Sequence, residues 1–142
     1  MISTVAVGTD GSPTAGEAVR VAADVARRYE AELVLLSAYH DSARDSVRVP
    51  VADAELQWAH SPGARLRETL ARTEDDLRRQ GVGCRTLIDE GDPAEVLVRL
   101  AEECDADLLV IGNKGMKRRV LGSVPNSVTH KAPCSVFVVK TT

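Results

Sequence analysis

Short apolar runs alternate with longer amphipathic segments along the whole chain. Five runs rich in Val, Leu and Ile predict buried strands at residues 2–8, 33–39, 84–88, 108–111 and 135–140. Between them, apolar residues recur every three or four positions and predict helices at about residues 14–29, 62–80, 93–101 and 123–130. This alternation predicts a single α/β domain over residues 1–142, with a mainly parallel sheet and helices on both faces, because parallel neighbours need right-handed crossovers.

Local signals support several of these boundaries. Ser12-Pro13, Ser61-Pro62 and Asp92-Pro93 each combine a capping residue with a proline suited to a first helical turn. The hydroxyl of Ser123 is expected to cap the last helix in the same way. Residues 40–60 have no clear period, and we expect a long excursion with one short helical turn near Trp58.

The composition fits such a domain and excludes some function classes. Aromatic residues make up only 3% of the 142 positions, so the core is expected to consist of Val, Leu, Ile and Ala, as in a parallel sheet under Ala-rich helices. A net charge of −3 is unlike that of a nucleic-acid-binding protein. The cysteines Cys84, Cys104 and Cys134 form no C-x-x-C pair, so neither zinc nor a disulfide framework is expected.

The cysteines and the hydropathy also predict a location. Free thiols, the lack of a signal peptide and the lack of a long apolar run together predict a cytoplasmic protein that does not associate with membranes. Cys134 is interpreted as a small core thiol, with redox sensing as the less favoured alternative.

The strand at residues 108–111 runs into a glycine-rich, basic loop. Gly112 and Gly115 open this loop, and Gly122-Ser123 close it before a predicted helix. Its cations are Lys114, Lys117, Arg118 and Arg119, and without them the chain has 14 basic and 21 acidic residues. Bare main-chain N–H groups, a helix dipole and mobile positive charge together hold phosphate. Nucleotide binding is therefore the leading hypothesis.

A second polar turn, from Gly8 to Ser12, follows the first strand. Asp10 in this turn can hydrogen-bond a ribose hydroxyl or an adenine amine, or can stabilise the T-D-G-S turn itself. Ligands of parallel sheets bind beyond the carboxyl ends of the strands, where the strand order reverses. If the first and fourth strands are neighbours at that point, the two turns face one crevice.

Motifs along the whole chain resemble the universal stress protein family. They are V-G-T-D-G-S at residues 7–12, the strand at 33–39, I-G-N-K-G at 111–115, G-S-V-P-N-S-V at 122–128 and A-P-C-S-V-F-V-V at 132–139. The resemblance implies an open, Rossmann-like parallel sheet of five strands in the order 3-2-1-4-5. In one branch of the family it also implies bound ATP.

The same resemblance implies the ligand and its contacts. In the ATP-binding branch the aspartate after the first strand contacts the nucleoside, the second strand ends at the adenine, and a motif G-x2-G-x9-G-[S/T] holds ribose and phosphates. The nucleotide-binding residues expected at matching positions are Thr9, Asp10, Ala38, Tyr39, Ile111, Gly112, Lys114, Gly115, Gly122, Ser123, Val124 and Asn126. The expected ligand is ATP, alone or with Mg²⁺, or another adenine nucleotide such as AMP or cyclic AMP.

The glycine motif departs from the family pattern in one respect. Six residues separate Gly115 from Gly122, where the ATP-binding pattern has nine. The shorter span changes how far the loop reaches along the terminal phosphates. A monophosphate or cyclic nucleotide demands less of this loop.

The resemblance further implies a homodimer paired through the last strand. The expected contact residues are Val136, Phe137, Val138 and Val139. A run of four apolar residues would otherwise leave a sheet edge open to pairing with other chains.

The residues leave several functions open. The first is a nucleotide-binding regulatory or stress-response protein with little or no catalysis, since no paired carboxylates, general base or nucleophile stand out near the loop and no catalytic or metal-binding residue is predicted. The alternatives are a slow ATPase or nucleotidyl-transferring enzyme using Asp10 and Ser123, and a universal stress protein that binds no ATP and acts through dimerisation. A receiver-type phosphoacceptor using Asp89 and Lys140 fits poorly, because receivers carry adjacent acidic residues after the first strand.

Overall fold

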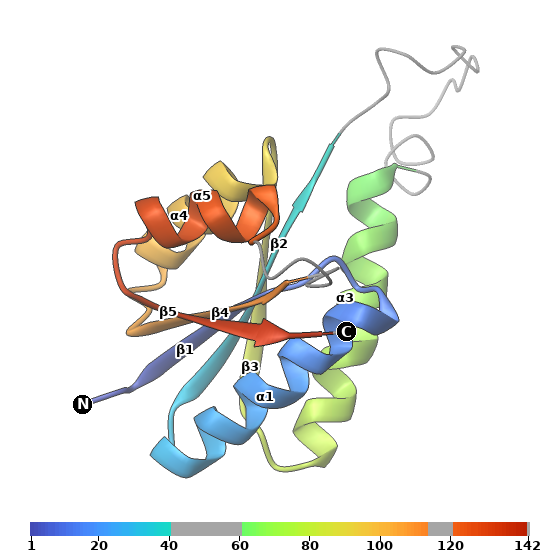
Figure 1. Ribbon diagram of the computed structural model, residues 1–142. Helices are drawn as coiled ribbons and strands as arrows, with labels where there is room; N and C mark the ends of the chain where they lie inside the picture. Colours follow the sequence, from blue (N-terminus) through green and yellow to red (C-terminus); the bar gives the residue numbers. More distant parts are fainter. Residues whose placement is uncertain (41–60, 114–120, 142) are drawn as a thin grey trace.

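The computed structural model describes residues 1–40, 61–113 and 121–141. In these parts strands and helices alternate strictly along the chain. The elements are β1 (Thr4–Gly8), α1 (Pro13–Tyr29), β2 (Glu32–Tyr39), α3 (Pro62–Arg79), β3 (Cys84–Glu90), α4 (Pro93–Glu103), β4 (Leu108–Asn113), α5 (Ser123–Lys131) and β5 (Ser135–Lys140). The strands form one parallel sheet in the order β3-β2-β1-β4-β5 (Figure 1). The predicted single-domain α/β fold and its strand order are confirmed.

Both faces of the sheet are buried under helices. The helices α1 and α3 cover one face, and α4 and α5 cover the other (Figure 1). Alternate residues of β1 divide between the two cores, with Val5 and Val7 beneath α1 and Ala6 beneath α4. This burial on both sides explains why the strands are continuous apolar runs. No helix in the described parts of the chain is both long and apolar enough to cross a membrane.

Sheet pairing moves four of the predicted strand boundaries, one of them the start of β2, which lies at Glu32 instead of Leu33. The first strand begins at Thr4 instead of at residue 2, and β3 continues to Glu90. The predicted end of the fourth strand at Ile111 is wrong, because Gly112 and Asn113 continue the ladder opposite Val139 and Lys140 of β5. Hydrogen bonds from the neighbouring strand hold a glycine and an asparagine in the sheet, although both have low strand propensity.

Three helices begin with the predicted side-chain caps. Each capping oxygen accepts a hydrogen bond from the main-chain N–H three residues later: Ser12 from Ala15 (3.2 Å), Ser61 from Ala64 (3.1 Å) and Asp92 from Glu95 (3.2 Å). A proline follows each cap, where the missing N–H has no cost.

The start of α5 differs from the starts of the other three described helices. Gly122 is its N-cap residue, with extended φ and ψ of −62° and 170°, and no side chain caps this helix. The predicted capping role of Ser123 is therefore wrong. Ser123 is already the first helical residue, and a hydroxyl caps a helix only from the extended N-cap position.

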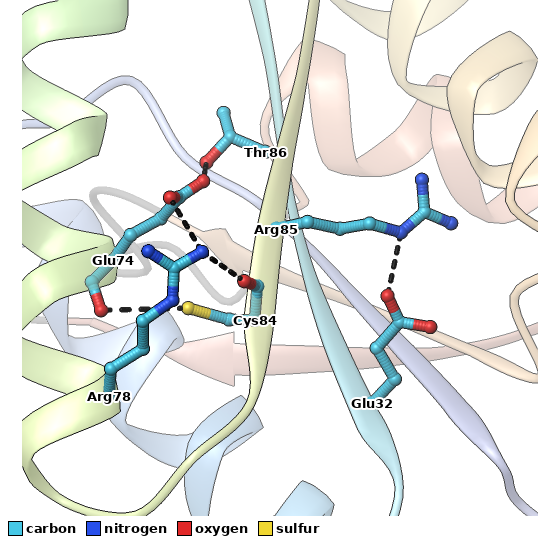
Figure 2. A network of polar contacts seen from close by, with 6 residues as sticks. All are labelled: Glu32, Glu74, Arg78, Cys84, Arg85 and Thr86. Atoms are coloured by element: carbon cyan, nitrogen blue, oxygen red, sulfur yellow. Dashed lines mark hydrogen bonds and ion pairs between the residues drawn. The ribbon is translucent and has the colours of Figure 1, made fainter.

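Polar contacts fasten α3 to the edge strand β3 (Figure 2). Glu74 accepts a hydrogen bond from the Thr86 hydroxyl and pairs with Arg78 at 3.3 Å. Arg78 also donates to the main-chain oxygen of Cys84 at 3.1 Å, and the Cys84 thiol contacts the main-chain oxygen of Glu74 at 3.7 Å. The Glu74 side chain is only 17% exposed, so these contacts replace hydrogen bonds to water. They keep α3 over the sheet edge opposite β5.

One carboxylate ties the beginnings of β1 and β4 together. Asp107 Oδ2 accepts hydrogen bonds from the main-chain N–H groups of Ser3 (2.8 Å) and Thr4 (2.9 Å) and from the Ser3 hydroxyl (3.1 Å). These bonds, led by the one from the Ser3 main chain, hold the pKa of the Asp107 carboxyl below its ordinary value.

We expect Asp107→Asn to lower the free energy of unfolding at neutral pH and to lose this effect in acid. Because the folded-state pKa is depressed, the contribution of the carboxylate is complete above its unfolded pKa, near 3.8, and disappears as the pH falls through the folded-state value. Urea unfolding curves recorded from about pH 7 down to about pH 3 will measure the difference.

The matched control is Asp105→Asn in the same connection. In the described residues the Asp105 carboxylate has no hydrogen-bond partner, and its φ of 50° suits Asn. A difference between wild type and Asp107→Asn that stays constant over the whole pH range would contradict the assignment.

Candidate functional site

A cavity of about 410 Å³ lies beyond the carboxyl ends of β1, β2 and β4. At this point the strand order reverses, because β1 is flanked by β2 on one side and β4 on the other. The chain leaves β1 into α1 on one face and reaches β4 from α4 on the other. This is where open parallel sheets bind ligands, and the volume suits a small organic molecule.

The sheet brings most of the expected site residues together at this cavity. Those that line it are Thr9, Asp10, Ala38, Ile111, Gly112, Gly122, Ser123 and Val124. Tyr39 and Asn126 do not line it: the Tyr39 main-chain oxygen accepts a hydrogen bond from Gly91, and the Asn126 main-chain N–H donates to Gly122. The other expected positions lie outside the described residues: Lys114, Gly115, Lys117, Arg118, Arg119 and the helical turn near Trp58.

Hydrogen bonds fix the turn between β1 and α1 at the cavity wall. The Thr9 main-chain N–H donates to Leu36 at 2.9 Å, and the Ser37 hydroxyl donates to the main-chain oxygen of Thr9. Asp10 Oδ1 accepts from the Ser12 N–H at 2.9 Å, which is the turn-stabilising role considered for this residue. Asp10 is nevertheless exposed and lines the cavity, so the structural role leaves its carboxylate at the cavity wall.

Two glycines near the cavity are required for different reasons. Gly11 has a φ of +78°, and a Cβ at this position would lie 2.8 Å from Thr69 Cγ2 of α3. Gly112, in contrast, has no positive φ. A Cβ on Gly112 would instead lie 2.9 Å from Thr141 Cγ2, which makes this glycine a packing requirement between β4 and the end of β5.

Buried polar side chains gather at this cavity. In the described parts of the chain the buried polar residues are Thr9, Ser37 and Asn113, with exposures of 8%, 1% and 0%, and all three line the cavity. Sequence reasoning missed Ser37 and Asn113. Their signal was a polar residue inside an apolar strand, because such residues are retained only where hydrogen bonds compensate for burial.

Other lining residues are of types that do not by themselves indicate ligand binding. Thr14, Pro93, Leu97, Pro125 and Thr141 also line the cavity. They come from three helices and the segment after β5, so only the tertiary fold brings them together. Leu97 and Ile111, 7% and 3% exposed, give the cavity an apolar wall.

The first turn of α5 presents main-chain donors to the cavity. Ser123 and Val124 line it, and no side chain caps this helix. Pro125 has no N–H, so Ser123 and Val124 supply the N–H groups of the first turn. An uncapped helix N-terminus carries partial positive charge and attracts anions.

The described residues that line the cavity include few groups for acid–base or nucleophilic chemistry. Among its lining residues in the described parts of the chain, Asp10 is the only ionisable one. The same parts contain no group of three or more His, Cys, Asp or Glu placed to hold a metal ion. The free cysteines lie elsewhere, and burial raises the pKa of the Cys84, Cys104 and Cys134 thiols. Raised pKa values disfavour the reactive thiolate, as expected for core thiols.

Asp89 does not lie beside Asp10, as a phosphoacceptor site would need. It lies at the end of the edge strand β3, two strands from β1 and Asp10. Its carboxylate pairs with Arg99 of α4 at 2.7 Å. The observed geometry supports setting the receiver-type alternative aside.

Comparisons with known proteins agree with the fold and the motifs. A model of the universal stress protein family matches residues 1–140. The universal stress protein Rv1636 of Mycobacterium tuberculosis is 36% identical over 152 aligned positions, which cover 98% of this chain and 97% of that protein. The universal stress protein MJ0531 of Methanocaldococcus jannaschii is 32% identical over 96% of this chain and 81% of its own length.

A solved structure extends this similarity to three dimensions. A universal stress protein crystallised in complex with cAMP has a TM-score of 0.74 and 33% identity, with 99% of each chain covered. Together with the match to the family model, these similarities show that the chain belongs to the universal stress protein family.

Proposed function

We propose that the protein binds an adenine nucleotide in the cavity at the carboxyl ends of β1, β2 and β4, with a phosphate group at the first turn of α5. The observation that carries the proposal is the uncapped start of α5, which opens into a cavity lined by the buried polar residues Thr9, Ser37 and Asn113. The similar universal stress protein crystallised with cAMP supports the choice of ligand class.

Different described residues suit the base, the ribose and the phosphate of a nucleotide. Leu97 and Ile111 form an apolar wall for a base, and the end of β2 at Ala38 offers main-chain groups for its polar edge. Asp10 is a carboxylate acceptor for ribose hydroxyls. Ser123 and Val124 supply N–H donors, and Ser123 adds a hydroxyl, which together suit one phosphate group.

This donor set favours a nucleotide with a single phosphate. A triphosphate needs further cationic or metal contacts, whereas the first turn of α5 supplies donors for one phosphate group. Six residues instead of nine separate Gly115 from Gly122, which also suits a shorter phosphate chain. AMP and cyclic AMP are therefore the preferred ligands of the proposal. ATP, alone or with Mg²⁺, is the alternative.

A binding role with little or no catalysis follows from the same lining residues. Binding needs no general base or nucleophile, whereas ATP hydrolysis needs a positioned water and a stabilised leaving group. A regulatory, stress-related role fits this binding function and the membership of the universal stress protein family, and we place it in the cytoplasm because the cysteines are free thiols. A slow ATPase, and a family member that acts through dimerisation without a nucleotide, remain the competing functions.

Thermal unfolding with added nucleotides tests the proposal. Ligand at about 100 times its dissociation constant stabilises a protein by about 2.7 kcal/mol, so AMP, cyclic AMP or ATP should raise the melting temperature clearly. GMP and inorganic phosphate are the controls for base and phosphate recognition. Failure of every adenine nucleotide to raise the melting temperature would refute the proposal, and steady ADP release from ATP would favour the enzyme.

We further propose that the protein is a homodimer paired through β5. This strand lies at the edge of the sheet, and its Phe137 is 44% exposed. Val139 is buried, and Val136 and Val138 pack against the core beneath α4 and α5, so Phe137 and the open main-chain edge are the surface left for a partner. A second copy of β5 would cover both.

A further inference from the structure

Asn113, the last residue of β4, is completely buried at the wall of the cavity. Burying an amide side chain without hydrogen bonds is unfavourable, so its contacts indicate why an asparagine can occupy this position. Its side-chain oxygen Oδ1 accepts a hydrogen bond from the Gly122 N–H at 2.9 Å. The two residues are nine positions apart, and this bond joins the end of β4 to the start of α5.

A second contact extends the connection to β5. The Thr141 hydroxyl, directly after β5, donates to the main-chain oxygen of Asn113 at 3.1 Å. Thr141 also lines the cavity and packs against Gly112. Asn113 therefore links three segments that meet at the cavity: the end of β4, the start of α5 and the segment after β5.

The bond to Gly122 restrains α5 in a way that a normal cap does not. In α1, α3 and α4 the capping side chain accepts the N–H of the third helical residue. In α5 the third residue is Pro125, which has no N–H to donate. Asn113 instead binds the N–H of the N-cap residue from outside the helix, so it uses neither the Ser123 N–H nor the Val124 N–H.

We propose that Asn113 is a positioning residue of the nucleotide site. Its side-chain oxygen fixes the uncapped first turn of α5 against β4, so that the N–H groups of Ser123 and Val124 are held in place for the ligand phosphate. Preorganised donors bind more tightly because no ordering of the helix end accompanies binding. This inference rests on the proposed function.

Replacement of Asn113 by Leu tests the proposal, because Leu has a similar volume and no acceptor. We expect the dissociation constant for AMP to rise about tenfold, the effect of losing one hydrogen bond, at a temperature where the variant stays folded. In the nucleotide-free protein the Gly122 amide hydrogen should exchange with solvent about tenfold faster. Asn113→Ala, which also lacks the acceptor, provides the same test if Leu does not fit.

Two further variants separate positioning from general stability. Asn113→Asp keeps an oxygen at the Oδ1 position, so it should restore protection of the Gly122 amide. Thr129→Val removes a hydrogen bond within α5, from the Thr129 hydroxyl to the Asn126 main-chain oxygen at 2.9 Å, away from the cavity. It should change neither the AMP affinity nor the Gly122 exchange rate.

The outcomes distinguish this inference from the function on which it rests. If wild type binds AMP and the folded Leu and Ala variants bind it equally well, the positioning role is wrong. Unchanged exchange of the Gly122 amide in those variants would also overturn it. If wild type binds no adenine nucleotide, the proposed function fails and the positioning role fails with it.

Discussion

Replacing Ser123 by Asp is expected to weaken nucleotide binding about a hundredfold without weakening the fold. Ser123 is the first residue of α5, and no side chain caps this helix. A carboxylate in a first helical turn interacts favourably with the helix dipole, by about 0.3–1 kcal/mol. The same carboxylate would repel a ligand phosphate about 5 Å away by about 3 kcal/mol at an effective dielectric constant near 20, which weakens binding about a hundredfold.

Two measurements check these opposite effects. Calorimetric titration with AMP should show the loss of affinity, and the melting temperature without ligand should stay the same or rise. Thr129→Asp is the matched control, because it adds the same charge to an exposed position of α5 that does not line the cavity. Equal AMP affinity in Ser123→Asp and wild type would place the phosphate somewhere other than α5.

The opposite effects of Ser123→Asp on stability and on nucleotide affinity have a physical origin in the site itself. The other described helices begin with capping side chains that satisfy an N–H group, whereas α5 leaves its first-turn donors to the cavity. Capping residues stabilise a helix by about 1 kcal/mol, so the protein forgoes stability at this position. Local rules that are broken where a ligand is expected are typical of functional sites.

The fold could be predicted from the sequence because each element carries its own signal. The strands are buried on both faces, so they are continuous apolar runs, and Ser12, Ser61 and Asp92 mark helix starts that the structure confirms. The strand order came from the family resemblance, because apolar runs alone do not say which strands are neighbours. The end of β4 was placed too early since its pairing with β5 is not a local property.

The site was only partly predictable for the same reason. Asp10 lies in a local turn and Gly122 at the start of α5, and both features can be identified from residue types. Asn113 and Thr141 come together only because β4 and β5 pair in a register that places Asn113 opposite Lys140, next to Thr141. The cap assigned to Ser123 was wrong by one position, since Gly122 takes the extended N-cap conformation.

Replacing Phe137 by Lys is expected to convert the proposed dimer into monomers. Phe137 is 44% exposed on the edge strand β5, so its loss costs the isolated chain little. In a symmetric pair of β5 strands each substitution occurs twice, which places two ammonium groups at one interface and removes two aromatic side chains. Losing a central aromatic contact commonly costs about 2 kcal/mol or more of binding free energy.

Light scattering at micromolar concentration measures this change directly. Wild type should have about twice the chain mass of 15.2 kDa, and Phe137→Lys should have the mass of one chain. Tyr29→Lys is the control, because Tyr29 is a 53% exposed aromatic residue at the end of α1, away from β5. A wild type of one chain mass would refute the dimer. A variant that remains as dimeric as wild type would place the interface on another surface, because β5 pairing cannot accommodate two opposed lysines without losing affinity.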